Sequence, residues 1–338
     1  MKLSEIGEFG VIERFARHFK DMTGNKITGI GDDCAIMPMD DHYEQVITTD
    51  LLIEEIHFLR SKISPFNLGY KSLAVNLSDI AAMGGRPTGS FLSVAIPPDM
   101  EVEFMDEFIE GYRALSGKYG VPLLGGDTTK SPGKLVINVC VTGITERGKA
   151  RMRSQARPGD VVCVTGPLGD SAGGLKVLLA NHEAEEEFRP LLNWHWKPEP
   201  AVNEGLWLAR QEAVHAMIDL SDGIASDLEH IVRGSNTGAL IDVDKVPLSH
   251  ALKQASEKHG WNALEMALTG GEDYRLLVTI GPEYYKIIKE AYDQHFSEPL
   301  ASVGYITEQT PGKIGWTQNG KAVELDKGGF NHFSDKTD

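Results

Sequence analysis

Carboxylates beside small residues recur at five places in this chain and point to metal chemistry. The first place is GIGDDCA at 29–35, where two glycines lead into adjacent acids. Adjacent carboxylates repel, so the pair is tolerable when exposed or when a cation lies between them. The others are TTD at 48–50, NLSD at 76–79, GGDTT at 125–129 and DLSDG at 219–223. In each, an Asp ends an apolar run or lies in a turn, and together they predict one multi-magnesium site for nucleotide phosphates.

The prediction of magnesium depends on the number of acids and on their mutual repulsion. One Asp beside a Gly in a turn is usually only turn chemistry. Magnesium prefers carboxylate and water oxygens and usually also takes substrate phosphates. Two like charges about 4 Å apart repel by about 4 kcal/mol at an effective dielectric of about 20, so these acids bind cations or do not meet. The predicted oxygen ligands are Asp33, Thr48, Thr49, Asp50, Asp79, Asp127, Asp219 and Asp222.

Other phosphate and metal motifs are absent from the sequence. It contains no G-x-x-x-x-G-K-[ST], G-x-G-x-x-G or H-E-x-x-H pattern and no protein-kinase signature. The glycine-rich stretch at 166–174 could cradle phosphate, but close helix packing also uses glycines. Several histidines lack zinc-ligand spacing, so we expect surface or core roles for them; they are His57, His182, His195, His215, His230 and His250.

A buried helix must position one of these acids. The stretch 68–83 has apolar residues around most of its circumference, which predicts a buried helix. Ser72, Asn76, Asp79 and Met83 fall on one stripe at i, i+4, i+7 and i+11. A buried carboxylate needs a partner, so we expect Asp79 to face the site and not solvent.

The remaining elements predict a mixed α/β fold in two domains. Helices between strands favour sheets covered by helices. A chain of 338 residues is long for one core, and a basic stretch followed by a turn predicts domains at 1–148 and 149–338. The predicted strands are 44–50, 90–96, 121–124, 135–144, 161–165 and 275–280, and the other predicted helices are 9–22, 103–119, 175–180, 224–233 and 283–295.

Composition excludes several classes of partner. The net charge of −16 argues against a nucleic-acid or anionic-membrane partner, which would need a basic patch. The three cysteines form no disulfide framework, which predicts a reducing cytoplasm. The N-terminus lacks an apolar signal core, and no uncharged apolar run is long enough to span a membrane.

Seven motifs resemble one known family. They are GIGDDCA, TTD…IHF, NLSDIAAMG, GGDTTKS, ARPGD…VTGPLGDSAGGL, IDLSDGIASDL and GGEDYRLL, and they run from about residue 5 to residue 333. Each motif is shared by the superfamily of aminoimidazole ribonucleotide synthetase-like ATP-binding enzymes. With HF after the TTD strand and GGEDY near the end, the set resembles the thiamine-monophosphate kinase family.

The resemblance implies a reaction and an assembly. The reaction is ATP-dependent phosphorylation of thiamine monophosphate to thiamine diphosphate, by direct in-line transfer and as the final step of thiamine diphosphate biosynthesis. Such a transfer needs positioning and charge neutralisation, and the acceptor phosphate is already ionised, so no catalytic base is assigned. The implied cofactor is Mg²⁺, several ions per site. The implied assembly is a homodimer paired through N-terminal strands, with a C-terminal α/β domain packed against each.

The same resemblance assigns residues to ligands. The eight oxygen ligands above would hold magnesium. Gly126, Asp127, Arg153 and Ser221 would contact ATP, with Arg151 as the alternative to Arg153. Many relatives carry Trp at the position of Phe330, and either ring can stack on thiamine. The residues implied to contact thiamine monophosphate are His57, Glu272 and Phe330.

Two other functions stay open. One is an ATP-dependent synthetase of the same superfamily that phosphorylates a carbonyl or amide oxygen, or a selenium donor. The selenium enzymes need a reactive Cys near the N-terminus, and the first here, Cys34, lies inside the acidic turn. The other is a nucleotide-binding regulator without catalysis, although a sensor need not keep so many metal ligands.

Overall fold

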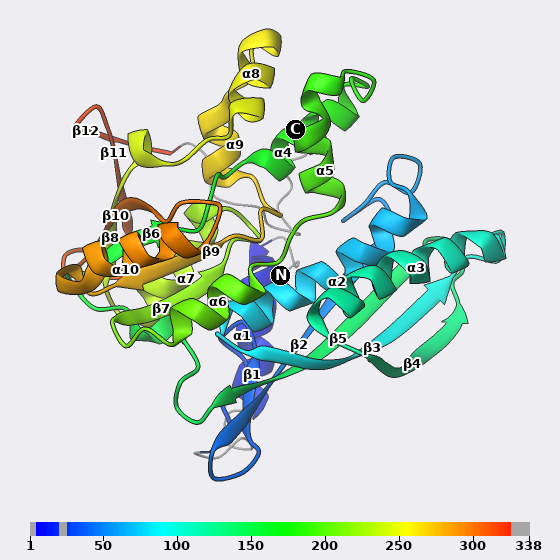
Figure 1. Ribbon diagram of the computed structural model, residues 1–338, viewed down its shortest axis with the longest axis horizontal. Coiled ribbons are helices and arrows are strands. Elements are labelled where there is room, and N and C mark those ends of the chain that lie inside the picture. The colour runs from blue at the N-terminus through cyan, green and yellow to red at the C-terminus, as the bar shows by residue number, and fades with distance from the viewer. Residues whose placement is uncertain (1–4, 20–25, 326–338) are drawn as a thin grey trace.

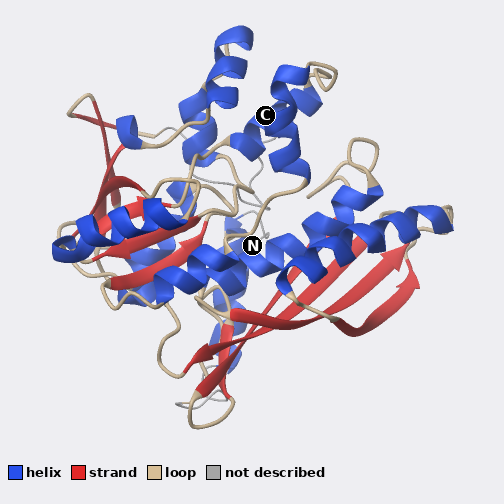
Figure 2. Ribbon diagram, viewed as in Figure 1, coloured by secondary structure: helices blue, strands red, loops and turns tan. Residues whose placement is uncertain are grey.

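Two β-sheets with helices packed on them make up the fold (Figures 1 and 2). The computed structural model describes residues 5–19 and 26–325. The first sheet is mixed, with strand order β1-β2-β5-β3-β4, and its strands come from the first half of the chain. They are β1 (Ala35–Pro38), β2 (Tyr43–Ile53), β3 (Arg86–Ile96), β4 (Leu123–Lys130) and β5 (Val136–Glu146).

The second sheet comes from the second half of the chain. Its order is β12-β11-β8-β10-β6-β9-β7, and β11 and β8 are its one parallel pair among the described strands. The predicted mixed α/β class is therefore confirmed. The strands are β6 (Val161–Val164), β7 (Val214–Asp219), β8 (Gly238–Asp242), β9 (Leu276–Ile280), β10 (Ala301–Thr307), β11 (Ile314–Gln318) and β12 (Lys321–Val323).

Helices pack on both sheets and between them (Figure 1). The α-helices of the first half are α1 (Gly7–Phe19), α2 (Pro65–Ala82) and α3 (Val102–Tyr119). Those of the second half are α4 (Asp170–Leu179), α5 (Arg189–Trp196), α6 (Val202–Ala209), α7 (Ile224–Gly234), α8 (His250–His259), α9 (Ala263–Thr269) and α10 (Pro282–His295). Three short 3₁₀ turns are η2 (Arg153–Gln155), η3 (Glu186–Phe188) and η4 (Val243–Lys245).

Helix α2 is the central element, and it is buried as its apolar pattern predicted. Ser64 caps its N-terminus by accepting a hydrogen bond from the Asn67 N–H at 3.2 Å. Every residue from 68 to 82 is buried except Asp79, which is half-buried. Gly69 allows close approach to α3, since a Cβ there would lie 1.8 Å from the carbonyl oxygen of Phe108. The helix contacts both sheets, so its one carboxylate lies between the two halves of the chain.

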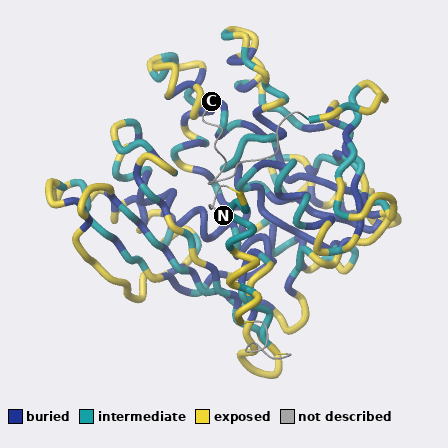
Figure 3. Tube along the Cα trace, turned by 180° about the vertical axis from the view of Figure 1, so that it is seen from behind, coloured by how far each residue is buried: buried dark blue, intermediate teal, exposed yellow. Residues whose placement is uncertain are grey.

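The two faces of the first sheet differ. Helices α2 and α3 lie over one face (Figure 1). Side chains alternate along β2, so Thr48 and Leu52 are buried on the helix-covered face while Thr49 and Leu51 are exposed on the opposite face. We call this second side the open face. Edge strand β4 is exposed along its whole length, and it forms a continuous exposed segment in Figure 3.

The halves share one hydrophobic core. Val46 and Leu73 from the first half belong to the same buried cluster as Met217 and Val278 from the second. The domains are therefore packed against each other and not joined by a flexible linker alone. Among the described residues, no helix is both long and apolar enough to cross a membrane.

Two local predictions were wrong. The strand predicted at 121–124 continues as β4 to Lys130, so Asp127 lies inside a strand and not in a turn. The helix predicted at 175–180 begins earlier, at Asp170, and includes Gly174. A Cβ on Gly174 would lie 2.4 Å from the carbonyl oxygen of Leu191 in α5, so this glycine serves close helix packing.

Candidate functional site

Carboxylates from distant parts of the chain meet between the two sheets. Asp33 precedes β1, Asp79 lies on α2 and Asp219 ends β7, and each places one oxygen within 4.8 Å of the others. Asp50 on β2 lies near enough for its charge to act on Asp79 and Asp219. We call Asp33, Asp50, Asp79 and Asp219 the acid cluster. The sequence predicted that these acids would converge, and the structure brings these four together.

Hydrogen bonds from hydroxyl groups of the first half fix the acid cluster. The Thr48 hydroxyl donates to the Asp79 carboxylate. The Ser78 hydroxyl donates to Asp219 Oδ2 at 2.7 Å, which joins α2 to the end of β7. These bonds hold the carboxylates in place against their mutual repulsion, which is about 3–4 kcal/mol per pair at 4.8 Å and an effective dielectric of about 20.

Burial and neighbouring like charges raise pKa values in the acid cluster. Burial raises the pKa of Asp50 to about 6, and the charges of Asp33 and Asp222 add to the rise. Burial also raises the pKa of Asp79 well above its usual range, with Asp50 as the next cause. The pKa of Asp219 also rises because of burial, with the charge of Asp33 as the next largest cause. Protons or cations must compensate this charge.

Two further acids belong beside the cluster and were not among the predicted ligands. Asp32 has a pKa raised to about 7 by burial and then by the charge of Asp33. Asp227, on the first turns of α7, is 2% exposed and accepts a hydrogen bond from the Asp222 N–H at 3.2 Å. The signal for Asp227 was available in the motif SDGIASD, because its acid falls one helical turn beyond the turn that holds Asp222.

Arg153 and Arg151 have different surroundings. Arg153 Nη2 donates to Asp33 Oδ1 at 2.5 Å, and its backbone N–H donates to Asp32 Oδ2 at 3.1 Å. Arg151 instead donates to the carbonyl oxygens of Ala209 and Gln211, at 2.6 and 3.0 Å. The geometry therefore puts Arg153 at the acid cluster and gives Arg151 a structural role.

Glu272 lies in a strained loop that packs against the 219–223 turn. Its φ is +64°, and its N–H donates to the Ser221 carbonyl oxygen at 2.7 Å. Lys71 on α2, which is 1% exposed, donates to Glu272 Oε2 at 3.0 Å. His195 on α5 lies 3.4 Å from the same carboxylate, and burial followed by the charge of Lys71 lowers the pKa of His195 to about 4. Lys71 is a functional candidate that the sequence argument missed, although a Lys inside a buried helix was a visible signal.

The other residues predicted to contact the substrates are His57, Ser221 and Phe330. His57 follows β2, and its Nδ1 accepts a hydrogen bond from the Ile53 N–H at 3.0 Å, so the second nitrogen carries the proton. Ser221 lies in the turn between Asp219 and Asp222. Phe330 lies outside the described residues.

Three predicted residues do not join the acid cluster within this chain. Gly126 and Asp127 are on edge strand β4, three strands from Asp50 in the order β2-β5-β3-β4. At about 4.8 Å per strand, this separates the backbones by about 14 Å. Asp127 also pairs across the sheet with Ser93, on the open face. Thr49 lies on that open face and donates to the Val139 carbonyl oxygen at 3.1 Å.

The glycine-rich stretch 166–174 does not form a free phosphate cradle. The Gly169 N–H, just before α4, donates to Asp273 Oδ2 at 2.6 Å, and the Ser171 N–H donates to the other oxygen at 3.3 Å. This carboxylate occupies the helix N-terminus where a phosphate would bind. Of the two interpretations of these glycines, the structure supports packing.

The donor set of the acid cluster fits hard cations. One carboxylate oxygen each of Asp33, Asp79 and Asp219 lies within 4.8 Å of the others. Among the four acids of the cluster, Arg153 pairs with Asp33 alone. The buried charge that is left suits Mg²⁺, with water completing its coordination. The acid cluster would hold such ions, and they would supply positive charge that neutralises phosphate groups. The site can therefore hold and orient a polyphosphate between the two halves of the chain.

Comparison with family models defines the class. Residues 31–145 match the N-terminal domain of AIR synthase related proteins, and residues 157–317 match the C-terminal domain. Fold and acid cluster therefore define an AIR synthase related protein.

Full-length relatives narrow this class. The chain is 37% identical over 330 residues to the thiamine-monophosphate kinase of Escherichia coli K12, covering 97% of this chain and 98% of the relative. It is 37% identical over 331 residues to that of Buchnera aphidicola from Schizaphis graminum, covering 97% and 99%. A solved structure of AaThiL complexed with AMPPCP and TMP superposes with a TM-score of 0.85 at 34% identity, covering 98% and 99%. The chain belongs to the thiamine-monophosphate kinase family.

Proposed function

We propose that this protein transfers the γ-phosphoryl group of ATP to thiamine monophosphate, giving thiamine diphosphate in the final step of its biosynthesis. The observation that carries the proposal is the acid cluster, formed by acids from both halves of the chain, in a member of this family. AaThiL, with 34% identity, was solved with AMPPCP and TMP together, and this supports two phosphorylated substrates for one site. The relatives share the name thiamine-monophosphate kinase, and this supports thiamine monophosphate as the acceptor.

The mechanism we infer is direct in-line transfer without a covalent intermediate. Asp33, Asp50, Asp79, Asp219 and Asp222 would hold Mg²⁺, and the bound ions would supply neutralisation of phosphate charge. The acceptor phosphate is already ionised near neutral pH, so no side chain needs to remove a proton. The protein's contribution is to orient the donor and the acceptor and to exclude water between them.

Three groups of side chains have distinct positions in this proposal. Arg153, beside Asp33, would contact ATP together with Ser221. Glu272, oriented by Lys71, would contact thiamine monophosphate. The other proposed substrate contacts are His57 and Phe330, and Phe330 lies outside the described residues.

A homodimer completes the proposal. Leu51, Phe91 and Leu124 are 49%, 41% and 59% exposed on or beside the open face, and a second copy would cover them. Since Asp127 cannot share an ion with Asp50 of its own chain, we infer that Gly126 and Asp127 act on the partner's site. On β2, Thr49 would then face the dimer interface, and Thr48 would face the acid cluster. We take the domains as 1–148 and 149–338, in agreement with the separation of the two sheets.

The cysteines support a cytoplasmic location. Cys34, Cys140 and Cys163 are all free thiols, as expected in a reducing compartment.

The experiment that tests the function uses purified protein with ATP, Mg²⁺ and thiamine monophosphate. Thiamine diphosphate should form with ADP in equal amounts, and Asp50→Ala should lose turnover by about 100-fold or more because a metal ligand is removed. Asp106→Ala, an exposed acid on α3, is the matched control and should keep full activity. Preference for free thiamine as acceptor, or ATP hydrolysis without thiamine diphosphate, would show that the proposed reaction is wrong.

A further inference from the structure

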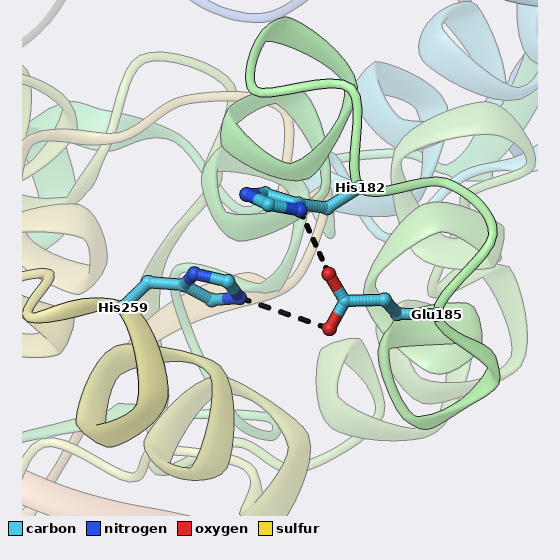
Figure 4. Close-up of side chains that lie close together, drawn as sticks. All are labelled: His182, Glu185 and His259. Carbon is cyan, nitrogen blue, oxygen red and sulfur yellow. Dashed lines mark ion pairs between the residues drawn. The ribbon is translucent and has the colours of Figure 1, made fainter.

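A second group of metal-binding side chains lies outside the acid cluster. His182 follows α4, Glu185 precedes η3 and His259 ends α8, and one ligand atom of each lies within 4.8 Å of the others (Figure 4). His182 Nδ1 is 2.7 Å from Glu185 Oε1, and His259 Nε2 is 4.0 Å from Glu185 Oε2. His182 and Glu185 come from the turn between α4 and η3, and His259 comes from the end of α8.

The ring nitrogen of His259 is the observation that points to a ligand. His259 Nε2 is buried and has no hydrogen-bond partner among the described residues, and it faces Glu185 (Figure 4). An unpartnered buried nitrogen costs about 1–3 kcal/mol, which a bound cation would recover. Trp261 stacks on the His259 ring with centroids 4.8 Å apart, and Phe188 packs edge-on at 5.3 Å, so this ring is held in place.

The backbone that carries the other two ligands is also fixed. The His182 N–H donates to the Val177 carbonyl oxygen at 3.0 Å, and the Glu185 N–H donates to the His182 carbonyl oxygen at 3.0 Å. The turn therefore presents both side chains to His259 without a loop having to order.

We propose that His182, Glu185 and His259 form a site for a divalent transition metal of the zinc class. Two imidazoles and one carboxylate are a recurrent zinc ligand set, and three protein ligands leave a fourth position for water. Imidazole nitrogen favours zinc, cobalt and nickel over magnesium, so this site and the acid cluster select different ions. The sequence did not suggest it, because His182 and His259 are 77 positions apart and show no zinc-ligand spacing.

Lys258 is the competing cation. Its Nζ lies 2.6 Å from Glu185 Oε2 and 2.5 Å from Glu187 Oε1. Because Glu187 remains as a partner, Lys258 can release Glu185 to a metal without becoming unpaired. Removing the Lys258 ammonium should therefore tighten metal binding.

The metal would stabilise the segment that leads to α5 and its contacts with Glu272 and Asp273. Residues 182–188 continue directly into α5, where Trp194 donates to the Asp273 carbonyl oxygen at 3.1 Å and His195 lies beside Glu272. A metal that links this segment to α8 would restrict the motion of α5 and so stabilise its contacts with Asp273 and Glu272. The site has a structural role in this proposal and takes no part in phosphoryl transfer.

The test uses the full chain, stripped with a chelator and then saturated with Mg²⁺ so that the acid cluster is occupied. Co²⁺ is titrated by visible absorption and Zn²⁺ by calorimetry. One equivalent of Co²⁺ should give the intense visible bands of four-coordinate cobalt, and Zn²⁺ should displace it. His182→Gln and His259→Gln should each weaken binding by about 100-fold or more, since loss of even an outer-shell partner costs about 10–100-fold.

Control variants show whether the cobalt bands come from these three side chains. His250→Gln, an exposed histidine at the other end of α8, and Asp79→Asn in the acid cluster should both keep the cobalt bands. Lys258→Gln should lower the zinc Kd several-fold, and it tests the proposal even if the histidine variants fold poorly. The proposal is overturned if wild-type protein gives no cobalt bands, if the bands survive both histidine variants, or if Lys258→Gln leaves the zinc Kd unchanged.

Discussion

The ammonium of Lys71 lies 3.0 Å from the carboxylate of Glu272, which is 201 positions later in the chain. Lys71 is on α2 of the first half and is 1% exposed, whereas the Glu272 side chain is 25% exposed. Lys71 also donates to the carbonyl oxygen of His195 at 3.1 Å. One buried cation thus joins α2, α5 and the loop of Glu272, and it holds Glu272 in a backbone conformation that is otherwise unfavourable.

The variant Lys71→Met tests whether Lys71 orients Glu272 alone or acts on the whole site. The Glu272 carboxylate would lose its cation, so the free energy of unfolding should fall by about 2 kcal/mol. This loss is smaller than for a fully buried pair because the Glu272 side chain is 25% exposed. KM for thiamine monophosphate should rise about tenfold or more, while KM for ATP changes little. Steady-state kinetics with each substrate varied in turn measures this difference.

An exposed ion pair provides the control for Lys71. Lys118 lies 2.5 Å from Glu199, with the two side chains 49% and 40% exposed. Lys118→Met should cost less than about 1 kcal/mol and leave both KM values unchanged, because exposed pairs contribute little. Equal rises of both substrate KM values in Lys71→Met would mean that Lys71 acts on the whole site and not on Glu272.

Magnesium should stabilise the protein more at neutral than at acidic pH. Burial raises the pKa of Asp50 from 3.8 to about 6 and that of Asp32 from 3.8 to about 7. A pKa that is higher in the folded state contributes stability that is full below the unfolded value and is lost as pH rises through the folded value. Without metal, these acids therefore destabilise the folded protein most above about pH 7, and Mg²⁺ relieves that repulsion.

The measurement is the rise in unfolding midpoint caused by Mg²⁺ at about pH 7.5 and about pH 5.5. The rise should be larger at the higher pH, with a stabilisation of about 2.7 kcal/mol when Mg²⁺ is at about 100 times its Kd. His195 and His230 act in the opposite direction, since burial lowers both pKa values from 6.5 to about 4 and their stabilisation is lost as pH falls. Their effect cancels because each comparison is made at one pH.

Asp79→Asn is the variant that checks this account. It removes one charge from the cluster and keeps a side chain that can accept from Thr48. Its metal-free midpoint at about pH 7.5 should exceed that of wild type, and its response to Mg²⁺ should be small. A lower metal-free midpoint in Asp79→Asn would contradict the role of repulsion in this site.

The sequence predicted the acid cluster because its signals are local. Asp79 could be placed because a helix that is apolar on most sides leaves a carboxylate only one direction in which to find partners. Asp50 could be placed because the β-branched residues before it specify a strand. Both predictions needed only the periodicity of one element.

Contacts between distant elements could not be predicted from local sequence patterns. Asp127 was predicted to lie at the end of an apolar run or in a turn. Instead, residues 125–130 continue β4, because pairing with β3 supplies backbone hydrogen bonds. The partnership of Lys71 with Glu272 depends on how two halves pack, which no local pattern encodes. His182 and His259 meet for the same reason.

Gly126→Ala should destabilise the edge of the first sheet. Gly126 has a φ of +154°, and a Cβ there would lie 1.7 Å from the carbonyl oxygen of Leu92. The strand must shift to accept a methyl group, at a cost of about 2 kcal/mol or more. Thermal or denaturant unfolding measures the loss, and it should be present without any nucleotide.

The neighbouring glycine is a matched control for Gly126. A Cβ on Gly125 would lie 3.6 Å from Phe91, which is an ordinary contact. Gly125→Ala should therefore change stability by less than about 1 kcal/mol. Wild-type stability in Gly126→Ala would mean that β4 relaxes easily, and that the glycine is kept for ligand approach alone.

Mixing two inactive variants should restore activity if Asp127 acts across the dimer. Asp127 lies on edge strand β4, three strands away from Asp50 on β2 of its own chain. Asp50→Ala and Asp127→Ala should each be inactive alone. In a heterodimer, the chain with intact Asp50 faces the chain with intact Asp127, so one of the two sites is complete. Random pairing after mixing, unfolding and refolding equal amounts should therefore recover about a quarter of wild-type turnover.

The control mixes Asp50→Ala with Asp219→Ala, two variants whose changed residues belong to the same chain's acid cluster. This mixture should recover no turnover after the same treatment. Absence of recovery with Asp127→Ala, in protein that still dimerises by light scattering, would place Asp127 outside the partner's site.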